Sequence, residues 1–425
     1  MEPEIKAATG SVDADVIDVI VVGSGPGGAT TAWKCAEGGL RVLLLERAVA
    51  LPRYKPCGGG LPASVARRIS GLDPAAFADL SITHLRHSWK GKDPVCAPMQ
   101  TTEGTPAEVW MVQRPRFDQH LVEKALGAGT RIETGVKIGG ARFENGAVTV
   151  WGTTAGGETR TWRARHVVGA DGAKGMIGAS VGLRLQKRHG IAREIEIPFL
   201  QGADSGRWHP VLLPHAAYLD YGTVPNGYAW IFPKRNCLSV GAGLLLPKAN
   251  AENANKGVGD LLLRAMDTLL TSVGLPLVPV GPNAPRLWAH PIPHWTGTEP
   301  LHVSDGNAHV LLVGDAAGMV QPLFGEGIQY ALRTGDLAAR LLLAGDASAY
   351  TEAVRAEFAR EFDAAGRVGR AFHRAPFLSY RLGVKNPRGT HLVGRIVAGE
   401  ASFADLEERI YDRLRHPLSR SRRAA

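Results

Sequence analysis

"IDVIVVGSGPGGATTAWKCAEGGLRVLLLERA", residues Ile17 to Ala48, carries the clearest secondary-structure pattern in the sequence. It begins with a short apolar run rich in β-branched residues, Ile17 to Val22, which is typical of a buried parallel strand. A glycine-rich turn follows, then a helix that ends near Gly38, and then a second apolar run, Arg41 to Leu45, that leads into Glu46. This order predicts a β-α-β unit.

The glycines after the first strand follow the pattern G-x-G-x-x-G at Gly23, Gly25 and Gly28. Gly23 permits a tight turn, Gly25 lets a pyrophosphate approach the backbone, and Gly28 lets the helix pack closely on the strand. The helix N-terminus favours phosphate charge, and Glu46 can accept hydrogen bonds from ribose hydroxyls. The unit therefore predicts a dinucleotide site, and the alternative is a glycine-rich turn in an unrelated α/β protein.

The length and the charge of the chain indicate how many structural units it has and which partners it could bind. With 425 residues it exceeds one typical domain, so we expect two or three structural units. The net charge is +9, and the C-terminal end contributes Arg413, Arg415, Arg420, Arg422 and Arg423. Such an end can attract nucleic acid or an anionic membrane surface, and the alternative is a solvated tail. No nucleic-acid motif accompanies it, so nucleic acid is set aside as a partner.

Targeting and metal signals are absent from the sequence. Acidic residues interrupt the N-terminal region where the apolar stretch of a signal peptide would lie. The uncharged stretch from Thr268 to Pro285 contains four prolines, which would break a spanning helix. We therefore expect a cytoplasmic protein or one that rests on a membrane surface. The cysteines lack metal-ligand spacing, so no metal site is expected.

A second strand-turn-helix pattern lies late in the chain, in "HVLLVGDAAGMVQPLFGEGIQYALRTGDLAARLLL", His309 to Leu343. An apolar strand leads into Gly314 and Asp315, and a helix begins near Gly327. The Asp315 carboxylate can bind a ribityl chain, and the backbone from Gly325 to Ile328 can approach a flavin ring. The alternative is an ordinary turn at a strand end.

These segments resemble the single-Rossmann flavoprotein superfamily that includes aromatic hydroxylases. "HVVGADGAK", His166 to Lys174, resembles its third signature, and "QRPRFDQHL", Gln113 to Leu121, resembles its Arg-x-x-Phe-Asp helix start. The resemblance implies one bound FAD. The residues expected at this cofactor are Gly23, Gly25, Gly27, Gly28, Glu46, Arg47, Cys57, Gly58, Gly60, Arg114, Val136, Asp171, Gly314, Asp315, Gly325, Gly327 and Ile328.

Two further motifs resemble those of the geranylgeranyl reductase family. "PRYKPCGGGLP" matches its Lys-Pro-Cys-Gly-Gly motif, and "PNGYAWIFPK", Pro225 to Lys234, matches its P-x-x-Y-x-W-x-F-P motif. The resemblance implies reduction of isolated C=C bonds in a polyprenyl chain by hydride transfer from reduced flavin plus protonation. The sequence has no second G-x-G-x-x-G, so the electron donor, NADPH or ferredoxin, is expected to bind transiently.

Cys57 and the aromatic motif supply the expected catalytic and substrate residues. A thiol beside the bare backbone of Gly58 to Gly60 can donate a proton near the flavin, and the alternative is a small buried cysteine that fills space. Tyr228, Trp230 and Phe232 alternate as on one face of a strand and suit an apolar chain, and the alternative is a packed core strand. The Tyr228 hydroxyl can join a proton relay.

We expect an α/β fold: a Rossmann-type FAD-binding domain, an inserted antiparallel-sheet substrate domain and a C-terminal helical region. The predicted boundaries are residues 15–80, 110–190 and 285–345 for the FAD-binding domain, 81–109 and 191–284 for the substrate domain, and 346–425 for the helical region. Rival functions are an FAD-dependent hydroxylase, a flavin-dependent halogenase and a non-enzymatic redox sensor that uses Cys57.

Overall fold

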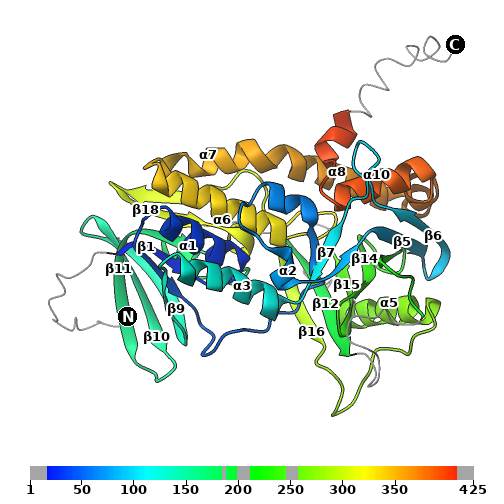
Figure 1. The fold of residues 1–425 in the computed structure, drawn as a ribbon, viewed down its shortest axis with the longest axis horizontal. Coiled ribbons are helices and arrows are strands. Elements are labelled where there is room, and N and C mark those ends of the chain that lie inside the picture. Colours follow the sequence, from blue (N-terminus) through cyan, green and yellow to red (C-terminus); the bar gives the residue numbers. More distant parts are fainter. Residues whose placement is uncertain (1–16, 184–187, 199–210, 246–256, 409–425) are drawn as a thin grey trace, which may run out of the picture.

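The computed structural model describes residues 17–183, 188–198, 211–245 and 257–408 (Figure 1). Both ends of the chain, including the arginines at 413, 415, 420, 422 and 423, lie outside the described residues. Within the described part of the chain, every helix falls short of the length and apolarity that a membrane crossing needs.

The larger sheet contains the predicted β-α-β unit. Its main strand order is β17-β18-β11-β1-β2-β8, with β9 and β10 continuing from β11 as an antiparallel ribbon. These strands are β1 (Ile17–Val22), β2 (Val42–Leu45), β8 (Arg131–Glu133), β9 (Val136–Glu144), β10 (Ala147–Thr154), β11 (Thr159–Gly169), β17 (His302–Asp305) and β18 (Ala308–Leu312). The pairs β1–β2, β1–β11, β2–β8 and β11–β18 are parallel, as expected for apolar runs buried on both faces.

Three long helices lie side by side along this sheet: α1 (Pro26–Glu37), α3 (Arg114–Gly127) and α6 (Ile328–Leu343) (Figure 1). Helix α1 is in the middle and contacts both of the others. The late strand-turn-helix of the sequence therefore packs directly against the early one. The carboxyl ends of β1 and β18 open toward the N-termini of α1 and α6, which is where open α/β sheets bind ligands.

The second sheet has seven strands in the order β16-β12-β15-β14-β13-β5-β6. They are β5 (His84–Trp89), β6 (Lys92–Pro98), β12 (Arg188–Pro198), β13 (Ala216–Tyr221), β14 (Gly227–Pro233), β15 (Cys237–Leu244) and β16 (Trp288–His294). All pairs except β5–β13 are antiparallel. Strand β16 lies within the range that the sequence predicts for the FAD-binding domain, yet it pairs with β12 in this sheet.

One face of the second sheet is covered by α5 (Val258–Ser272). Leu262, Met266 and Leu269 recur at helical spacing and are buried against Ile231 and Val240 of the sheet. The opposite face carries the aromatic motif. It turns toward the loop that follows β2, so the sheet places that motif beside the first domain.

A small sheet, β3-β7-β4, links the two larger ones. Its strands are β3 (Gly60–Pro62), β4 (Ala78–Ile82) and β7 (Val109–Val112), and short helices adjoin them: η1 (Ala63–Arg67) and α2 (Pro74–Phe77). Three further short helices lie elsewhere before the C-terminal part: α4 (Ile177–Ser180), η2 (Gly314–Ala317) and η3 (Ala347–Ala349). Because β3 starts at Gly60, this sheet fixes the end of the Cys57 loop.

The C-terminal part is helical as far as it is described. It comprises α7 (Tyr350–Val354), the π-helix η4 (Arg355–Ala359), α8 (Arg360–Arg374), α9 (Pro376–Ser379), the π-helix η5 (Tyr380–Val384) and α10 (Pro387–Val397). The predicted fold class, a Rossmann-type domain with an antiparallel-sheet domain and C-terminal helices, is confirmed. The exact domain boundaries stay a prediction.

Candidate active site

The glycine turn between β1 and α1 is closed by backbone contacts that exclude side chains. Gly23 has a φ of +101°, and a Cβ there would lie 2.4 Å from the Ala170 carbonyl oxygen. A Cβ on Gly28 would lie 1.9 Å from the Gly23 carbonyl oxygen, and one on Gly27 would lie 3.2 Å from the Ala331 carbonyl oxygen. The turn therefore brings β1, the end of β11 and helix α6 together around the N-terminus of α1.

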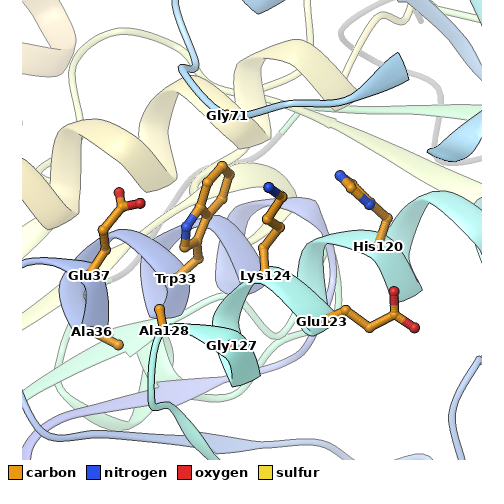
Figure 2. A pocket seen from close by; sticks show the side chains of 9 residues that line it. All are labelled: Trp33, Ala36, Glu37, Gly71, His120, Glu123, Lys124, Gly127 and Ala128. Atoms are coloured by element: carbon orange, nitrogen blue, oxygen red, sulfur yellow. The ribbon is translucent and has the colours of Figure 1, made fainter. Parts of the chain in front are cut away.

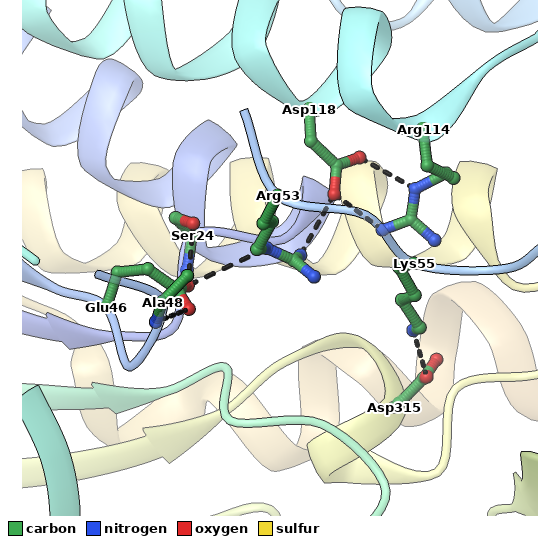
Figure 3. Close-up of polar contacts among 8 residues, drawn as sticks. All are labelled: Ser24, Glu46, Ala48, Arg53, Lys55, Arg114, Asp118 and Asp315. Carbon is green, nitrogen blue, oxygen red and sulfur yellow. Dashed lines mark hydrogen bonds and ion pairs between the residues drawn. The ribbon is translucent and has the colours of Figure 1, made fainter. Parts of the chain in front are cut away.

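Glu46 is held rigidly at the end of β2, opposite this turn. Its Oε2 accepts hydrogen bonds from the Ser24 backbone N–H at 2.8 Å and from the Ser24 hydroxyl at 2.6 Å, and its Oε1 accepts from the Ala48 N–H at 2.9 Å (Figure 3). Burial raises the pKa of this carboxyl, but the Arg53 charge and these hydrogen bonds outweigh it and lower the pKa below its ordinary value. Glu46 is therefore a charged acceptor at the strand end.

Arg53 lies across the N-terminus of α1, and the sequence analysis did not assign it. An ideal Cβ on Gly25 would lie 2.9 Å from the Arg53 guanidinium, and Nε is 3.7 Å from Glu46 Oε2. Its other end donates to Asp118 Oδ2 at 2.9 Å, and Arg114 holds the same carboxylate at 2.7 and 2.8 Å (Figure 3). The buried Nε of Arg53 has no hydrogen-bond partner among the described residues. This guanidinium can therefore accept an anionic ligand at the helix N-terminus.

The Gly-Asp turn after β18 lies beside the glycine turn and Arg53. Asp315 Oδ2 accepts a hydrogen bond from Lys55 Nζ at 3.0 Å, and Oδ1 lies 3.6 Å from an ideal Cβ on Gly327 (Figure 3). Gly327 is the N-cap of α6, and Gly314 donates its N–H to the Thr334 hydroxyl at 3.1 Å. Gly325 adopts a positive φ of +66°. The Gly-Asp turn and the Gly325–Ile328 segment therefore lie next to each other in the fold. In the sequence, Gly325 comes 10 positions after Asp315.

Three predicted cofactor residues have other surroundings. Arg47 is exposed. The Asp171 carboxylate accepts hydrogen bonds from the backbone N–H groups of Met176 and Ile177, where it caps α4, while its Cα lies 3.3 Å from an ideal Cβ on Gly23. Val136 is buried at the start of β9, and its N–H donates to the Glu46 carbonyl oxygen at 2.9 Å. Asp171 and Val136 adjoin the region through their backbone, and a contact of any of the three with FAD stays a prediction.

The Cys57–Gly60 loop lies directly on the aromatic face of the second sheet. An ideal Cβ on Gly58 would lie 3.0 Å from the Phe232 ring and 3.4 Å from the Trp230 Nε1. Gly59 has a φ of +78°, and a Cβ there would lie 2.2 Å from the Val112 carbonyl oxygen. The backbone contact at Gly59 requires a glycine, and Gly58 packs tightly against the two rings. The loop therefore places Cys57 where the two domains meet. The sequence had connected these motifs only through a family resemblance.

Tyr228, Trp230 and Phe232 form one continuous strip on β14, which we call the aromatic strip. Neighbouring ring centroids are 5.9 and 6.1 Å apart. On β15, Gly241 pairs with Trp230 and Gly243 pairs with Tyr228, and a Cβ on Gly241 would lie 2.1 Å from the Trp230 ring. The missing side chains let the indole lie over the neighbouring strand.

The Tyr228 hydroxyl is engaged at the top of this strip. It donates a hydrogen bond of 2.5 Å to the Phe324 carbonyl oxygen, in the loop before α6. Burial raises the pKa of Tyr228 well above its ordinary value, and the charge of Glu326 adds to the effect. Tyr228 therefore holds the two domains together, and its predicted part in a proton relay stays a prediction.

A buried polar network lies beside the strip and beneath the Cys57 loop. Lys234 Nζ donates to the Cys57 carbonyl oxygen at 3.0 Å and to Glu196 Oε1 at 2.7 Å. The Ser239 hydroxyl donates to Glu194 Oε1 at 2.9 Å and accepts from Trp230 Nε1 at 3.3 Å. Burial raises the pKa of Glu194 to about 7. In the sequence, only Lys234, which follows Phe232 and Pro233 in the aromatic motif, pointed to this network. Glu194 and Glu196 come from β12, far from that motif in the sequence, and Ser239 comes from β15.

A pocket of about 700 Å³ lies elsewhere, between α1 and α3 (Figure 2). Trp33 lines it, with Lys124 Nζ 5.5 Å from a ring centroid, together with His120, Glu123 and Glu37. The pocket contains none of the predicted site residues. It is open and mixed in charge, and we assign no role to it.

Comparison with known proteins identifies the family. A family model described as an FAD binding domain matches residues 16–217. The chain is 31% identical to a geranylgeranyl diphosphate reductase of Rhodobacter capsulatus over 77% of this chain and 75% of that protein. It is 30% identical to digeranylgeranylglycerophospholipid reductase 1 of Methanopyrus kandleri over 76% of this chain and 79% of that protein.

The chain belongs to the geranylgeranyl reductase family of FAD-dependent oxidoreductases. Its fold resembles that of a geranylgeranyl bacteriochlorophyll reductase-like protein from Thermoplasma acidophilum, with a TM-score of 0.69 and 23% identity over 84% of this chain and 87% of that one. A flavin-dependent brominase shares the fold with a TM-score of 0.65 and 20% identity over 94% of this chain and 100% of that one. The fold is therefore shared by reductases of this family and by other flavoenzymes.

The residues present fit the FAD of this family. Backbone N–H groups in the first turn of α1 and the Arg53 guanidinium, whose Nε makes no hydrogen bond to the described residues, suit a pyrophosphate, which carries negative charge. The carboxylates of Glu46 and Asp315 are acceptors for hydroxyl groups at the two ends of this region.

Proposed function

We propose that the protein is an FAD-dependent reductase that saturates C=C bonds of a polyprenyl chain. The observation that carries the proposal is the contact of the Cys57–Gly60 loop with the aromatic strip, in which Gly58 lies against Phe232 and Trp230. This contact joins the two motifs that resemble those of the family and gives an apolar wall beside the loop that carries the Cys57 thiol. The reductase names of the relatives from R. capsulatus and M. kandleri support a polyprenyl substrate.

The reaction requires a hydride on one alkene carbon and a proton on the other. Bound, reduced FAD supplies the hydride and its electron pair. The chain supplies the proton, and we assign this role to the Cys57 thiol, which would then regain a proton from solvent. Lys234 holds the loop through the Cys57 carbonyl oxygen, so the thiol is presented from a fixed backbone. A transient donor, NADPH or ferredoxin, would supply the reducing electrons for the next turnover.

Tyr228 is the second candidate proton donor. Its hydroxyl would first have to break the 2.5 Å hydrogen bond to the Phe324 carbonyl oxygen, and its raised pKa opposes proton release. Both features favour Cys57 as the donor. Tyr228 then serves as the end wall of the strip together with Trp230 and Phe232, the residues that we assign to the substrate.

The experiment that tests this function is an anaerobic incubation. Protein reduced by dithionite is mixed with a panel of polyprenyl diphosphates, polyprenyl glycerolipids and prenyl quinones, and the products are read by mass spectrometry. The proposal expects the gain of two hydrogen atoms for each bond reduced. A product that requires O2 and gains an oxygen atom would support a hydroxylase, and one that requires O2 and halide would support a halogenase. Either result, without anaerobic reduction, contradicts the proposal.

A further inference from the structure

Exposed apolar side chains gather at one place in the C-terminal helices. Phe377, Leu378 and Leu382, in α9 and the π-helix η5, are 55%, 57% and 67% exposed. Single exposed apolar residues are ordinary, but three large ones within six positions form a patch that calls for a partner. We call these three residues the apolar tip.

The chain around the apolar tip is strongly basic. Between Asp363 and Glu400 there is no acidic residue, and the seven basic ones are Arg367, Arg370, Arg374, Arg381, Lys385, Arg388 and Arg395. Asp93, near the start of β6, forms ion pairs with Arg381 and Lys385 and so neutralises part of this charge. Arg374 and Arg388 are exposed on either side of the tip. The surface is therefore apolar at its centre and cationic around it, which complements an anionic lipid surface.

A continuous line of aromatic rings connects the tip to the proposed reaction site. The ring of Phe377 meets Trp89 edge-on at 5.4 Å, and Trp89 lies 5.8 Å from Tyr380. Tyr380 lies 6.1 Å from Tyr221, and Tyr221 lies 6.4 Å from Tyr228, where the aromatic strip begins. The surface patch and the strip therefore belong to one apolar assembly that reaches the Cys57 loop.

We propose that the apolar tip docks on an anionic phospholipid bilayer and that a membrane-dissolved substrate enters along this line of rings. Phe377, Leu378 and Leu382 insert at the level of the headgroups, and Arg374 and Arg388 lie against lipid phosphates. The docking step is inferred from the exposed apolar and basic side chains and does not depend on the proposed function. The entry step rests on the proposed reduction of a polyprenyl chain.

The docking step is tested with the full-length holoprotein and vesicles of phosphatidylcholine, with or without phosphatidylglycerol. Flotation should show binding that needs phosphatidylglycerol and falls with salt. The triple variant Phe377→Ser/Leu378→Ser/Leu382→Ser should bind at least roughly 10-fold more weakly than the wild type, because it loses most of the inserted apolar area. The double variant Arg374→Gln/Arg388→Gln should lose the part of the vesicle binding that is sensitive to salt. The matched control Leu277→Ser/Val280→Ser, whose side chains are 60% and 84% exposed elsewhere, should bind like the wild type.

The outcomes separate docking from catalysis because binding is measured without turnover. The docking step is overturned if the triple variant binds the vesicles as strongly as the wild type does. It is also overturned if the wild type does not bind them. Light scattering that shows a dimer in the wild type and a monomer in the triple variant would also overturn it, since the tip would then cover a second copy. If docking holds but the triple variant reduces a vesicle-borne substrate at the wild-type rate, the entry step is wrong.

Discussion

At the residue scale, Arg53 is the cofactor-site candidate that the sequence did not reveal. The glycines and Glu46 could be predicted because their spacing is fixed by one β-α-β unit. Arg53 lies in an irregular loop, and its place became visible only through its contacts with Gly25, Glu46 and Asp118. Its desolvated charge is balanced by two carboxylates, and its Nε, which makes no hydrogen bond to the described residues, is the group to which an anion would accept one.

Arg53→Gln should weaken FAD binding by roughly 10- to 100-fold, the worth of one lost hydrogen bond to a charged group. Asp118 keeps both hydrogen bonds from Arg114, so the fold should survive. Titration of the apoprotein with FAD, followed by flavin fluorescence, measures the change. Arg131→Gln, at an exposed arginine on β8, is the control for loss of charge. Equal affinities in the two variants would count against this anion site.

Glu194 gives a pH-dependent prediction at the same scale. Burial raises its pKa to about 7 in the folded protein, so the carboxyl stays protonated there at a pH at which it ionises in the unfolded chain. Its contribution to stability is complete below its ordinary pKa and is lost as the pH rises through about 7.

Glu194→Gln, which is permanently neutral, should therefore gain thermal stability relative to the wild type as the pH rises from about 5 to about 8. Thermal unfolding across that range measures the difference, with the exposed Glu158→Gln as control. A gain that is constant with pH, or that shrinks as the pH rises, would show that Glu194 is ionised in the folded protein.

At the element scale, the pairing of β14 with β15 gives the aromatic strip its shape. Alternation along β14 could be predicted from the sequence, but the need for Gly241 could not, because it depends on the register between two strands. The same holds for Glu194 and Ser239, which reach the strip from β12 and β15. Register is set by long-range pairing, so a single sequence shows the faces of strands but not the partners across them.

Gly241→Ala should displace the Trp230 ring, because the new Cβ would lie 2.1 Å from it. We expect FAD to be retained and the reoxidation of reduced flavin by alkene to slow by about 10²-fold, as for a misplaced positioning group. Gly127→Ala, at a helical position with open space around it, is the matched control and should be neutral. If Gly241→Ala does not fold, Trp230→Ala removes the ring instead. Wild-type rates in Trp230→Ala with full FAD occupancy would make the strip a packed core.

At the scale of the whole molecule, the fold class followed from local patterns and the assembly did not. The early and late strand-turn-helix patterns, the helical C-terminal part and the antiparallel domain were all predicted. The location of β16 in the second sheet was not, because a strand rich in proline and histidine, Trp288–His294, carries no signal for its partner β12. The two helical turns that carry the apolar tip, α9 and the π-helix η5, also lacked a sequence pattern, since the exposure of the tip depends on what packs behind it.

The histidines give a prediction for the stability of the whole molecule. Burial lowers the pKa of His87, His166, His290, His302 and His373 to about 4. Their contribution to stability is present above the ordinary histidine pKa and is lost as the pH falls toward 4, because the unfolded chain takes up the protons first. Thermal unfolding should therefore shift steeply to lower temperature between about pH 6.5 and about pH 4.

His87→Gln should flatten this acid slope, since His87 is fully buried beside the Tyr221 hydroxyl at 3.2 Å. The exposed His391→Gln should leave it unchanged. Proton uptake on unfolding, obtained from the pH dependence of the midpoint, is the quantity to compare. An equal slope in all three proteins would show that His87 is protonated in the folded state.

The Cys57 loop and the aromatic strip together form the site that we propose for alkene reduction. Anaerobic stopped-flow measurements on the wild type, Cys57→Ser and Cys57→Ala test it most directly, because they separate flavin reduction by dithionite from flavin reoxidation by a polyprenyl substrate. We expect normal FAD content and normal flavin reduction in all three proteins. We expect flavin reoxidation to be slowed by about 10²- to 10⁴-fold in both variants, with Cys57→Ala no faster than Cys57→Ser. Reoxidation at the wild-type rate in both variants, or no reoxidation by any polyprenyl substrate in the wild type, would contradict it.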